Sequence, residues 1–542
     1  MMKTYEVIAA ALLTEGVSHC FALLGDANMH LCTKLAEAID FTYLRHEHCC
    51  VAAATAFAHV RGEVGFASVT CGPGVTQLST ALPAAVRARI PVVVFAGEAP
   101  IKKAWYNQAI DQRPIVEATG AKYVALHHPA QMRTQIRDAF LAARRNRVPV
   151  VIGAPFDLQT EAWSGPTEDV LTSLDVIGSS AAVLPNPKDI ARVAARLSKA
   201  ERPIILAGLG AVSAKDALED LAEKTGALLA TSLPARGLFA GHSFELGLSG
   251  GFTNDAAREI FAEADLILGF GTSFASHAAD AGRLYPNAHV IQVDLDPKHI
   301  NQGRQSAHDT LRADASEAAK ALSKALDMQH GWRSNAMITR LSEAKRPVLP
   351  KTKTLSPQAV VAALDDVLPK DWFCVNSSGH CSYFFASMFG RHQENFLTIR
   401  EFGAIGNGTS YAIGAARARP NQKIVLFDGD GSLLMHIQEF ETMLRHNLNI
   451  LVVVMNDGAY GSEIHKLRAD GLSDHGAVFG RPDFAAMARG FGAKGDVFHT
   501  VDHLSDHLKE AAAPGLTVWD FHVDDTVPSS QIQRAHPKKE TS

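Results

Sequence analysis

Two acidic turns in the carboxy-terminal third of the chain carry the clearest chemical signal. Each follows an apolar run, at 424–427 and at 450–455, and each places an aspartate beside glycine: Gly429-Asp430-Gly431-Ser432 and Asn456-Asp457-Gly458. Carboxylate oxygens are ligands that Mg²⁺ prefers, and a glycine-rich turn before a helix lets backbone amides approach a phosphate. Asp430 and Asp457 are therefore candidates for a magnesium site that holds a diphosphate, although each alone could be an ordinary turn residue.

A strand, a helix and a second strand must position these aspartates. One helix is predicted between the two apolar runs, because five apolar residues share one face: Leu433, Ile437, Phe440, Met443 and Leu444. The strands of such a βαβ unit are parallel, so their carboxyl ends open at the same edge of a sheet. We expect the two aspartates side by side there, with Ser432 donating to the phosphate or capping the helix.

The same alternation of apolar runs, glycine-rich turns and helical patterns covers the whole chain. It predicts an α/β fold of three doubly wound parallel-sheet domains. Segments rich in proline and polar residues, near 161–187 and 344–357, separate the domains. We assign three domains and a tail that is either disordered or a lid: residues 1–165, 183–335 and 354–525, and the polar segment 526–542.

Composition excludes several classes of function. The chain has 542 residues, 47% of them hydrophobic, and a formal net charge of −5. It lacks the basic stripe that nucleic acid or an anionic membrane surface requires, and no apolar run approaches the roughly 20 residues that span a bilayer. Seven cysteines without a CxxC motif indicate reduced thiols. With no signal-peptide pattern at the start, we expect a cytoplasmic protein.

The spacing of the two acidic turns resembles a family signature. In that signature, a GDG motif is followed after about two dozen residues by NN. Here 24 residues separate Gly431 from Asn456. The family comprises the thiamine diphosphate-dependent enzymes related to acetolactate synthase, pyruvate oxidase and benzoylformate decarboxylase. Two further stretches are similar to family motifs, and the similarity covers about residues 1–525: Arg45-His46-Glu47 and Thr70-Cys71-Gly72-Pro73-Gly74.

The resemblance implies thiamine diphosphate and Mg²⁺ as cofactors. Metal ligands would be Asp430, Asp457 and the backbone carbonyl of Ala459. Asp457 replaces the second asparagine of the family, and aspartate is an equally hard oxygen donor. The remaining cofactor contacts that the resemblance implies come from three stretches: Gly429, Gly431 and Ser432; Gly403 and Ile405; and Ser378, Gly379 and His380. The alignment of the last stretch with the family motif is uncertain by one residue.

Glu47 is the catalytic acid that the resemblance implies. It would face N1′ of the aminopyrimidine ring, where a buried carboxylic acid can share its proton and promote formation of the C2 ylid. The residues alone favour a different role, in which Glu47 pairs with Arg45 or a nearby histidine. In the family this glutamate and the metal site come from different subunits, so we expect a homodimer or a homotetramer.

Four residues are assigned to the substrate by position in the family motifs. Gln108 matches a catalytic glutamine that contacts the reacting carbonyl. Asp26 and Asn28 either face the substrate or cap the next helix, and Thr70 stands where some relatives have a histidine. In the central domain, Gly269 and Gly271 form only part of a dinucleotide motif. Relatives bind FAD, ADP or nothing there, and we expect nothing.

The expected function is a carbon–carbon lyase or carboligase. Its substrates would be 2-oxo acids or 2-hydroxy ketones, and it would act through the C2 ylid and an enamine in decarboxylation, cleavage or acyloin formation. An acetolactate synthase-type transferase is the alternative, although the segment 460–466 lacks the tryptophan that those enzymes carry. A flavin- or nucleotide-binding oxidoreductase and a non-catalytic relative are the alternatives from other classes.

Overall fold

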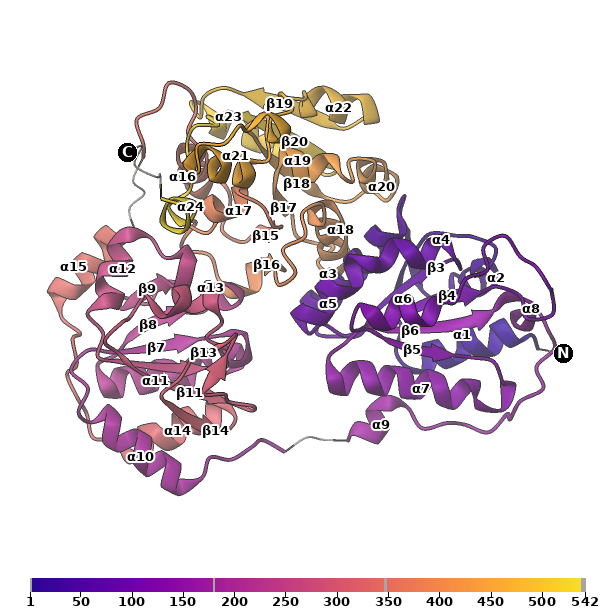
Figure 1. The fold of residues 1–542 in the computed structure, drawn as a ribbon, viewed down its shortest axis with the longest axis horizontal. Coiled ribbons are helices and arrows are strands. Elements are labelled where there is room, and N and C mark those ends of the chain that lie inside the picture. Colours follow the sequence, from indigo (N-terminus) through magenta and orange to yellow (C-terminus); the bar gives the residue numbers. More distant parts are fainter. Residues whose placement is uncertain (1, 179–180, 346–348, 538–542) are drawn as a thin grey trace.

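The structure is a computed structural model that describes residues 2–178, 181–345 and 349–537. It contains three six-stranded sheets, each with all of its strands parallel, and helices cover both faces of each sheet (Figure 1). The predicted fold class is therefore confirmed. The end of the expected tail, 538–542, and parts of the two expected linkers, 179–180 and 346–348, lie outside the described residues.

The N-terminal sheet has the strand order β2-β1-β3-β4-β6-β5. Its strands are β1 (His19–Ala22), β2 (Asp40–Tyr43), β3 (Gly65–Val69), β4 (Val92–Glu98), β5 (Lys122–Ala125) and β6 (Val150–Pro155). One face packs on α1 (Thr4–Thr14), α2 (Met29–Leu35) and α7 (Pro129–Asn146). The other packs on α3 (Glu47–Arg61), α5 (Ala81–Ala88) and α6 (Gln112–Ala118). Short helices complete the unit: α4 (Pro73–Thr76), α8 (Phe156–Gln159) and α9 (Ser173–Ile177).

The central sheet has the order β14-β11-β10-β7-β8-β9. Its strands are β7 (Pro203–Ala207), β8 (Leu228–Thr231), β9 (Glu245–Leu248), β10 (Leu266–Phe270), β11 (His289–Asp294) and β14 (Asp309–Arg312), with a separate antiparallel pair, β12 (Ile300–Asn301) and β13 (Arg304–Gln305). The helices α10 (Pro187–Leu197), α11 (Lys215–Thr225) and α14 (Ala315–Ala325) cover one face. The other is covered by α12 (Asp255–Ala262) and α15 (Asn335–Ala344), with α13 (Ser276–Ala279) nearby.

The C-terminal sheet has the order β16-β15-β17-β18-β20-β19. Its strands are β15 (Phe373–Asn376), β16 (Phe396–Thr398), β17 (Ile424–Gly429), β18 (Ile450–Asn456), β19 (Lys494–Phe498) and β20 (Leu516–His522). One face packs on α18 (Gly408–Ala418), α20 (Glu439–Arg445) and α22 (Phe484–Phe491), and the other on α16 (Pro357–Val367), α17 (Cys381–Phe385) and α23 (Leu504–Ala512). Three further helices lie at its carboxyl edge or beyond: α19 (Asp430–Leu434), α21 (Gly461–Ala469) and α24 (Ser530–Ala535).

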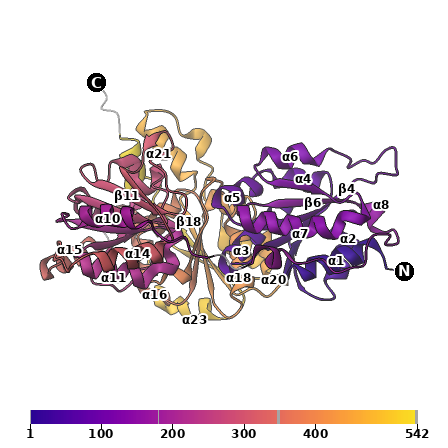
Figure 2. The ribbon, with the colours of Figure 1, turned by 90° about the horizontal axis from the view of Figure 1, so that it is seen from below.

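The N- and C-terminal domains share one hydrophobic core along α3 and α18, which lie side by side in Figures 1 and 2. The contact is unusually close because the facing residues are small. A Cβ at Gly414 of α18 would come within 2.1 Å of the backbone oxygen of Ala53 in α3. Glycine at that position lets the two helix backbones approach, so any larger side chain would force the domains apart.

One expectation about a helix needs correction. The single helix expected after Ser432 is two helices, α19 and α20, separated at residues 435–438. At the break, the buried ring of His436 hydrogen-bonds to the carbonyl of Gly406 (Nδ1···O, 2.8 Å), a contact to another segment that competes with a continuous helix. Within the expected tail the structure contains α24, and the lid role of this segment stays a prediction.

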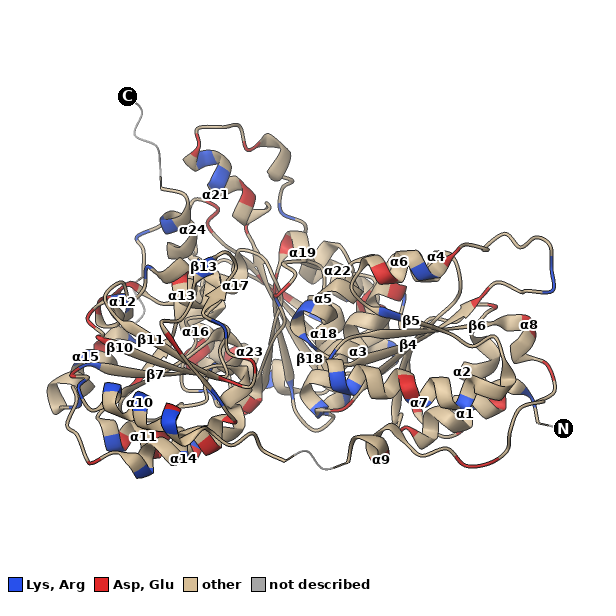
Figure 3. Ribbon diagram, turned by 60° about the horizontal axis from the view of Figure 1, so that its bottom comes forward, with Lys and Arg blue, Asp and Glu red and all other residues tan. Residues whose placement is uncertain are grey.

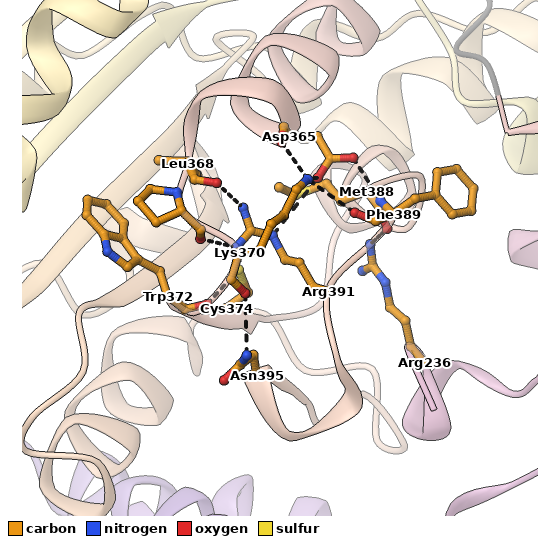
Figure 4. Close-up of polar contacts among 11 residues, drawn as sticks. Arg236, Asp365, Leu368, Lys370, Trp372, Cys374, Met388, Phe389, Arg391 and Asn395 are labelled. Carbon is orange, nitrogen blue, oxygen red and sulfur yellow. Dashed lines mark hydrogen bonds and ion pairs between the residues drawn. The ribbon is translucent and has the colours of Figure 1, made fainter. Parts of the chain in front are cut away.

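A polar cluster joins the central domain to the C-terminal domain (Figure 4). Arg236 is buried, donates to the carbonyl of Met388 and lies 4.2 Å over the ring of Phe396. Arg391, also buried, donates to the carbonyl of Leu368 at 2.8 Å. Asp365 accepts from Lys370 at 2.7 Å beside them. Burial lowers the pKa of Arg236 to about 10, so this contact uses a desolvated cation and π-stacking rather than a surface ion pair.

Charge and cysteine usage agree with the composition. Acidic and basic residues are interspersed over the ribbon in Figure 3. Each of the seven cysteines is a buried free thiol. Among the described residues, no helix has both the length and the apolar character needed to cross a membrane.

Candidate active site

Asp430 and Asp457 meet at the carboxyl edge of the C-terminal sheet. Strands β17 and β18 are neighbours in parallel register, with Gly429 paired to Met455, so the turns that follow them open together. A pocket of about 510 Å³, open to solvent, lies between these turns. Most of the predicted cofactor residues line it: Ser378, Gly379, His380, Ile405, Gly429, Asp430, Gly431, Ser432, Asp457 and Ala459.

Asp430 is buried and Asp457 is partly buried, and neither carboxylate makes an ion pair within the described residues. Backbone amides of Gly431 and Gly458 donate to Asp430 at 2.8 and 2.7 Å. Burial, and then the charge of Asp457, hold the pKa of Asp430 well above its ordinary value. Burial also raises the pKa of Asp457 to about 7. Two desolvated carboxylates with raised pKa values are stabilised by a bound cation, so this pair fits Mg²⁺.

A third oxygen ligand is available at Ala459. Ala459 pairs with Val478 in an isolated β-bridge. The hydrogen bonds of this bridge come from the neighbouring residues: Phe479 N–H donates to the Gly458 carbonyl at 3.0 Å, and Tyr460 N–H donates to the Ala477 carbonyl at 2.9 Å. The carbonyl of Ala459 itself takes no part in the bridge. The described residues hold no cluster of three or more His, Cys, Asp or Glu side chains suited to a metal. A metal here therefore needs oxygens from backbone and ligand in addition to the two aspartates.

An unpaired hydroxyl on the pocket wall fits a phosphate. The hydroxyls of Ser377 and Ser378 and the amide nitrogen of Asn376 are buried and have no hydrogen-bond partner among the described residues. Buried polar groups are rarely left unpaired, and of these three residues Ser378 lines the pocket, so its hydroxyl marks a ligand position. A side chain at Gly461 would collide with Asp457 Oδ2, 2.5 Å from the added Cβ, which keeps this side of the pocket open. The residues present thus fit a metal-bound diphosphate.

His380 differs from the other predicted cofactor residues. Its Nε2 accepts the backbone N–H of Ser529, at the start of α24, at 3.0 Å. Burial lowers its pKa to about 3, so the ring is neutral. The side chain holds the C-terminal segment against the pocket wall, which leaves Ser378 and Gly379 as the better cofactor contacts in this stretch.

The loop before α18 reaches the same pocket. Ser432 accepts the amide N–H of Gly406 at 2.8 Å, and His436 bonds to the carbonyl of the same residue. Ile405 consequently lines the pocket. Gly403 has φ +73° and lies exposed at the turn, outside the pocket lining. Its assignment as a cofactor contact therefore stays a prediction.

The predicted residues of the N-terminal domain gather at the carboxyl edge of their own sheet. Glu47 begins α3, with Oε1 3.7 Å from the Cβ position of Gly74, and Thr70 contacts the same position at 3.1 Å. A Cβ at Gly25 would meet Thr70 at 2.6 Å, and one at Gly72 would meet the carbonyl of Gln108 at 2.3 Å. Glycine is required at these turns so that the loops carrying Glu47, Thr70 and Gln108 can converge.

Asn28 and Asp26 lie in the same loop but make different contacts. Asn28 is completely buried and accepts from Gly25 N at 2.8 Å while donating to Leu23 O and Ser68 Oγ, each at 3.0 Å. It neither caps α2 nor faces solvent, so the structure favours a loop-holding role over substrate contact. Asp26 is exposed, and its carboxylate accepts from the hydroxyl of Tyr106 at 3.1 Å.

Helix α20 clamps the turn that carries Glu47. Glu439 accepts Arg45 N at 3.0 Å, His446 accepts Tyr43 N at 3.0 Å and Arg445 donates to Tyr43 O at 2.7 Å. Beyond this turn, His48 bonds to Asn407 (2.5 Å) next to the cofactor-facing loop. Glu47 therefore starts a helix whose first turn the C-terminal domain fixes from outside. The residues that line the pocket of Asp430 all belong to the C-terminal domain, so one chain holds Glu47 apart from that pocket.

Sequence reasoning missed several residues of this site. Tyr106, Glu439 and His436 touch predicted residues or their loops. The tyrosine lies two positions before Gln108, and the other two follow Ser432 in what was expected to be one regular helix. Their contacts cross between segments far apart in the chain, so spacing alone could not have found them.

In the central domain, the glycine turns are closed by backbone. A Cβ at Gly208 would lie 2.2 Å from the carbonyl of Gly271, and one at Gly271 would lie 2.4 Å from the backbone of Gly210. These glycines are explained by the contact between two turns after β7 and β10. They give no independent support for a nucleotide.

Three sequence models of one family match the chain. They describe the N-terminal TPP binding domain, the central domain and the C-terminal TPP binding domain of thiamine pyrophosphate enzymes, and they match residues 2–115, 190–322 and 377–521. Each match falls on one of the three sheets and its helices.

Curated relatives match over most of their length. Acetolactate synthase isozyme 2 large subunit of Escherichia coli is 28% identical, over 94% of this chain and 93% of the relative. Acetolactate synthase isozyme 1 large subunit of the same organism is 26% identical, over 90% and 88%. Acetolactate synthase 2, chloroplastic, of Nicotiana tabacum is 28% identical, over 85% and 71%.

Proposed function

The chain belongs to the thiamine pyrophosphate enzymes as a thiamine diphosphate-dependent carboligase or lyase, and from that premise we propose how its residues serve the reaction. The observation that carries the proposal is the pair Asp430 and Asp457 at the ends of neighbouring strands, in a pocket that the unpaired hydroxyl of Ser378 also lines. Mg²⁺ would bind Asp430, Asp457 and the Ala459 carbonyl. The diphosphate would lie between the metal, the turn at 429–432 and Ser378.

Glu47 is the proposed proton partner of the coenzyme. When bound, thiamine diphosphate supplies a carbon nucleophile and an electron sink for breaking a bond next to a carbonyl. Glu47 would hold a proton at the pyrimidine ring, and Ile405 would support the coenzyme from the pocket wall. Because Glu47 is not among the residues that line the Asp430 pocket within one chain, we propose that a second copy supplies Glu47, in a homodimer or a dimer of dimers.

The proposed substrates are 2-oxo acids or 2-hydroxy ketones. The names of the relatives support an acetolactate synthase-type transferase as the second candidate. The segment 460–466, which forms the start of α21 beside the pocket, contains no tryptophan. We therefore propose the broader lyase or carboligase activity first. The seven reduced, buried cysteines support action in the cytoplasm, where thiols stay reduced.

Two variants test the assignment of roles. Glu47→Gln should retain thiamine diphosphate and Mg²⁺, measured by calorimetric titration, while turnover with a panel of 2-oxo acids and acyloins falls by several orders of magnitude. Asp430→Asn should lose metal-dependent coenzyme binding itself. Glu37→Gln, an exposed glutamate paired with Lys34, is the control and should change neither.

Each rival predicts a different result. A non-catalytic relative would bind no coenzyme in the presence of Mg²⁺. A flavin-dependent oxidoreductase would purify with a flavin absorbance. Near-normal turnover of Glu47→Gln would reject the role given to this residue.

A further inference from the structure

One buried carboxylate lies outside the pocket and has no part in the proposed reaction. Asp520, on β20, is completely buried and is not among the residues that line the pocket of Asp430. Its Oδ1 accepts from the side chain of Asn456 and its Oδ2 accepts from the backbone N–H of Phe484, each at 3.0 Å. His522 Nε2, at 3.6 Å, is its only ion-pair partner among the described residues. Burying a charge is costly, so this carboxylate directs attention to the groups that it holds.

Asn456 connects this carboxylate to residues 457–459, which we call the metal turn. It is completely buried and is the last residue of β18, directly before Asp457. Its amide nitrogen donates to Asp520 Oδ1 at 3.0 Å and to the carbonyl of Pro482 at 2.9 Å. Both partners are acceptors, so they fix which way the amide group faces and require N–H groups at this position. Aspartate, which this chain carries at 457, would set acceptor against acceptor at 456.

A second segment, 480–484, holds the metal turn from its other side. The first N–H group of this segment donates to the Gly458 carbonyl at 3.1 Å, within the metal turn. Its last N–H group is the one that donates to Asp520. One carboxylate therefore holds the end of the strand that leads into the metal turn, through Asn456, and the segment that packs on that turn.

We propose that Asp520 is a positioning residue for the metal site. By holding Asn456 and the segment 480–484 together, it fixes the metal turn between them, and with it the two ligand oxygens that the turn would supply, from Asp457 and Ala459. Mg²⁺ requires near-ideal geometry, and groups that hold metal ligands in place commonly change metal affinity by about tenfold to a hundredfold. The inference rests on the proposed function and adds to it a residue that does not line the pocket.

Two single variants break the contact, one from each side. Asp520→Asn leaves either Asn456 or the Phe484 N–H without its acceptor, and Asn456→Asp sets a second carboxylate against Asp520. Each should weaken Mg²⁺ binding by about tenfold to a hundredfold, measured by calorimetric titration in excess thiamine diphosphate, with the heat of titration into the coenzyme alone subtracted. At saturating Mg²⁺, kcat should return close to the wild-type value, because neither side chain lines the pocket.

A double variant separates this contact from a general loss of packing. Asn456→Asp combined with Asp520→Asn restores one donor and one acceptor in the reverse order, so its Mg²⁺ affinity should exceed that of either single variant. Two defects that only loosened the fold would add, and the double variant would then bind Mg²⁺ most weakly. Asp265→Asn is the matched control, because Asp265 accepts the backbone N–H of Arg202 at 3.0 Å in the central domain, and it should leave the affinity unchanged.

Hydrogen exchange of the wild type tests the same coupling without any substitution. Coupling between two sites is reciprocal, so Mg²⁺ with thiamine diphosphate should slow exchange of the Phe484 amide by about tenfold and leave that of Arg202 unchanged. Unchanged exchange at Phe484, single variants with wild-type Mg²⁺ affinity, or a double variant weaker than both would overturn this inference alone. A wild type that binds neither Mg²⁺ nor the coenzyme would overturn the proposed function instead.

Discussion

At the scale of single residues, Asp457 is where this chain departs from the motif that it otherwise matches. Its carboxylate lies close to that of Asp430, and desolvation raises its pKa to about 7. A raised carboxyl pKa means that the folded protein binds more protons than the unfolded chain between about pH 4 and pH 7. The metal-free protein should therefore lose stability as pH rises through that range.

We predict that Mg²⁺ with thiamine diphosphate raises the melting temperature more at pH 8 than at pH 6, because the bound cation removes this penalty. Asp457→Asn should stabilise the metal-free protein at pH 8 and reduce the difference between the two pH values. Differential scanning fluorimetry with and without Mg²⁺ measures both effects. A variant that melts below the wild type at pH 8 without metal would contradict the prediction.

Asn28 gives a residue-scale prediction about stability. Asn28→Ala would leave the amide of Gly25 without its acceptor and open a small cavity in a fully buried position. We expect a loss of about 1–3 kcal/mol in the stability of the N-terminal domain, seen as a lower denaturation midpoint. Asn28→Asp, which retains the acceptor for Gly25, should recover part of this loss unless its charge at a buried position outweighs that hydrogen bond.

At the scale of elements, α20 decides where Glu47 lies. Glu439 is fully buried and holds Arg45 N, whereas Glu441 is partly exposed and pairs with the Arg45 side chain at 2.6 Å. Glu439→Ala should lower kcat by about tenfold to a hundredfold, because a shift of the α3 start by ~1 Å misplaces Glu47. Glu441→Ala should change kcat little, since exposed ion pairs contribute little. Equal effects of the two variants in steady-state assays would argue against the clamp.

The contact between α3 and the segment between α19 and α20 also makes the stability of the fold depend on pH. His48 stacks on His436 with ring centroids 4.9 Å apart, and burial, then the charge of His436, lower the pKa of His48 to about 4. The unfolded chain takes up protons near the ordinary histidine pKa of about 6.5, but the folded protein does not. Stability should therefore fall as pH drops from about 6.5 toward 4.

Substitution of His48 tests this assignment. His48→Gln keeps a hydrogen-bonding group for Asn407 and removes the titration, so the loss of stability between pH 6.5 and pH 5 should be smaller than in the wild type. Melting temperatures across that range report the difference. A parallel decline in both proteins would show that other groups control the acid sensitivity.

At the scale of the whole molecule, the domains are joined by two different kinds of contact. The N- and C-terminal domains share an apolar core of small residues, while Arg236 connects the central and C-terminal domains through a carbonyl and an aromatic ring. Arg236→Met preserves much of the side-chain volume and removes both interactions. We expect faster proteolysis between α15 and α16, with the sheets themselves intact by circular dichroism. Arg133→Met, on α7 of the N-terminal domain, should leave the proteolysis rate unchanged.

The sequence by itself determined the elements and the chemistry at their ends. The spacing of apolar residues and the composition of the turns predicted three parallel-sheet domains. Asp430 and Asp457 follow the two strands of one βαβ unit, and this was enough to place them side by side, because parallel strands end at the same edge of a sheet. Motif resemblance added Glu47, Thr70 and Gln108, which the N-terminal sheet edge brings together.

Only the tertiary structure decided which side chains are free to act. It showed Asn28 engaged inside its loop, His380 engaged with α24, the expected single helix broken at His436, and Asp26 left exposed next to Tyr106. Each of these outcomes depends on hydrogen bonds between segments distant in the chain. Local pattern reports which face of an element is apolar, but it carries no information about which polar group from elsewhere satisfies a given donor or acceptor.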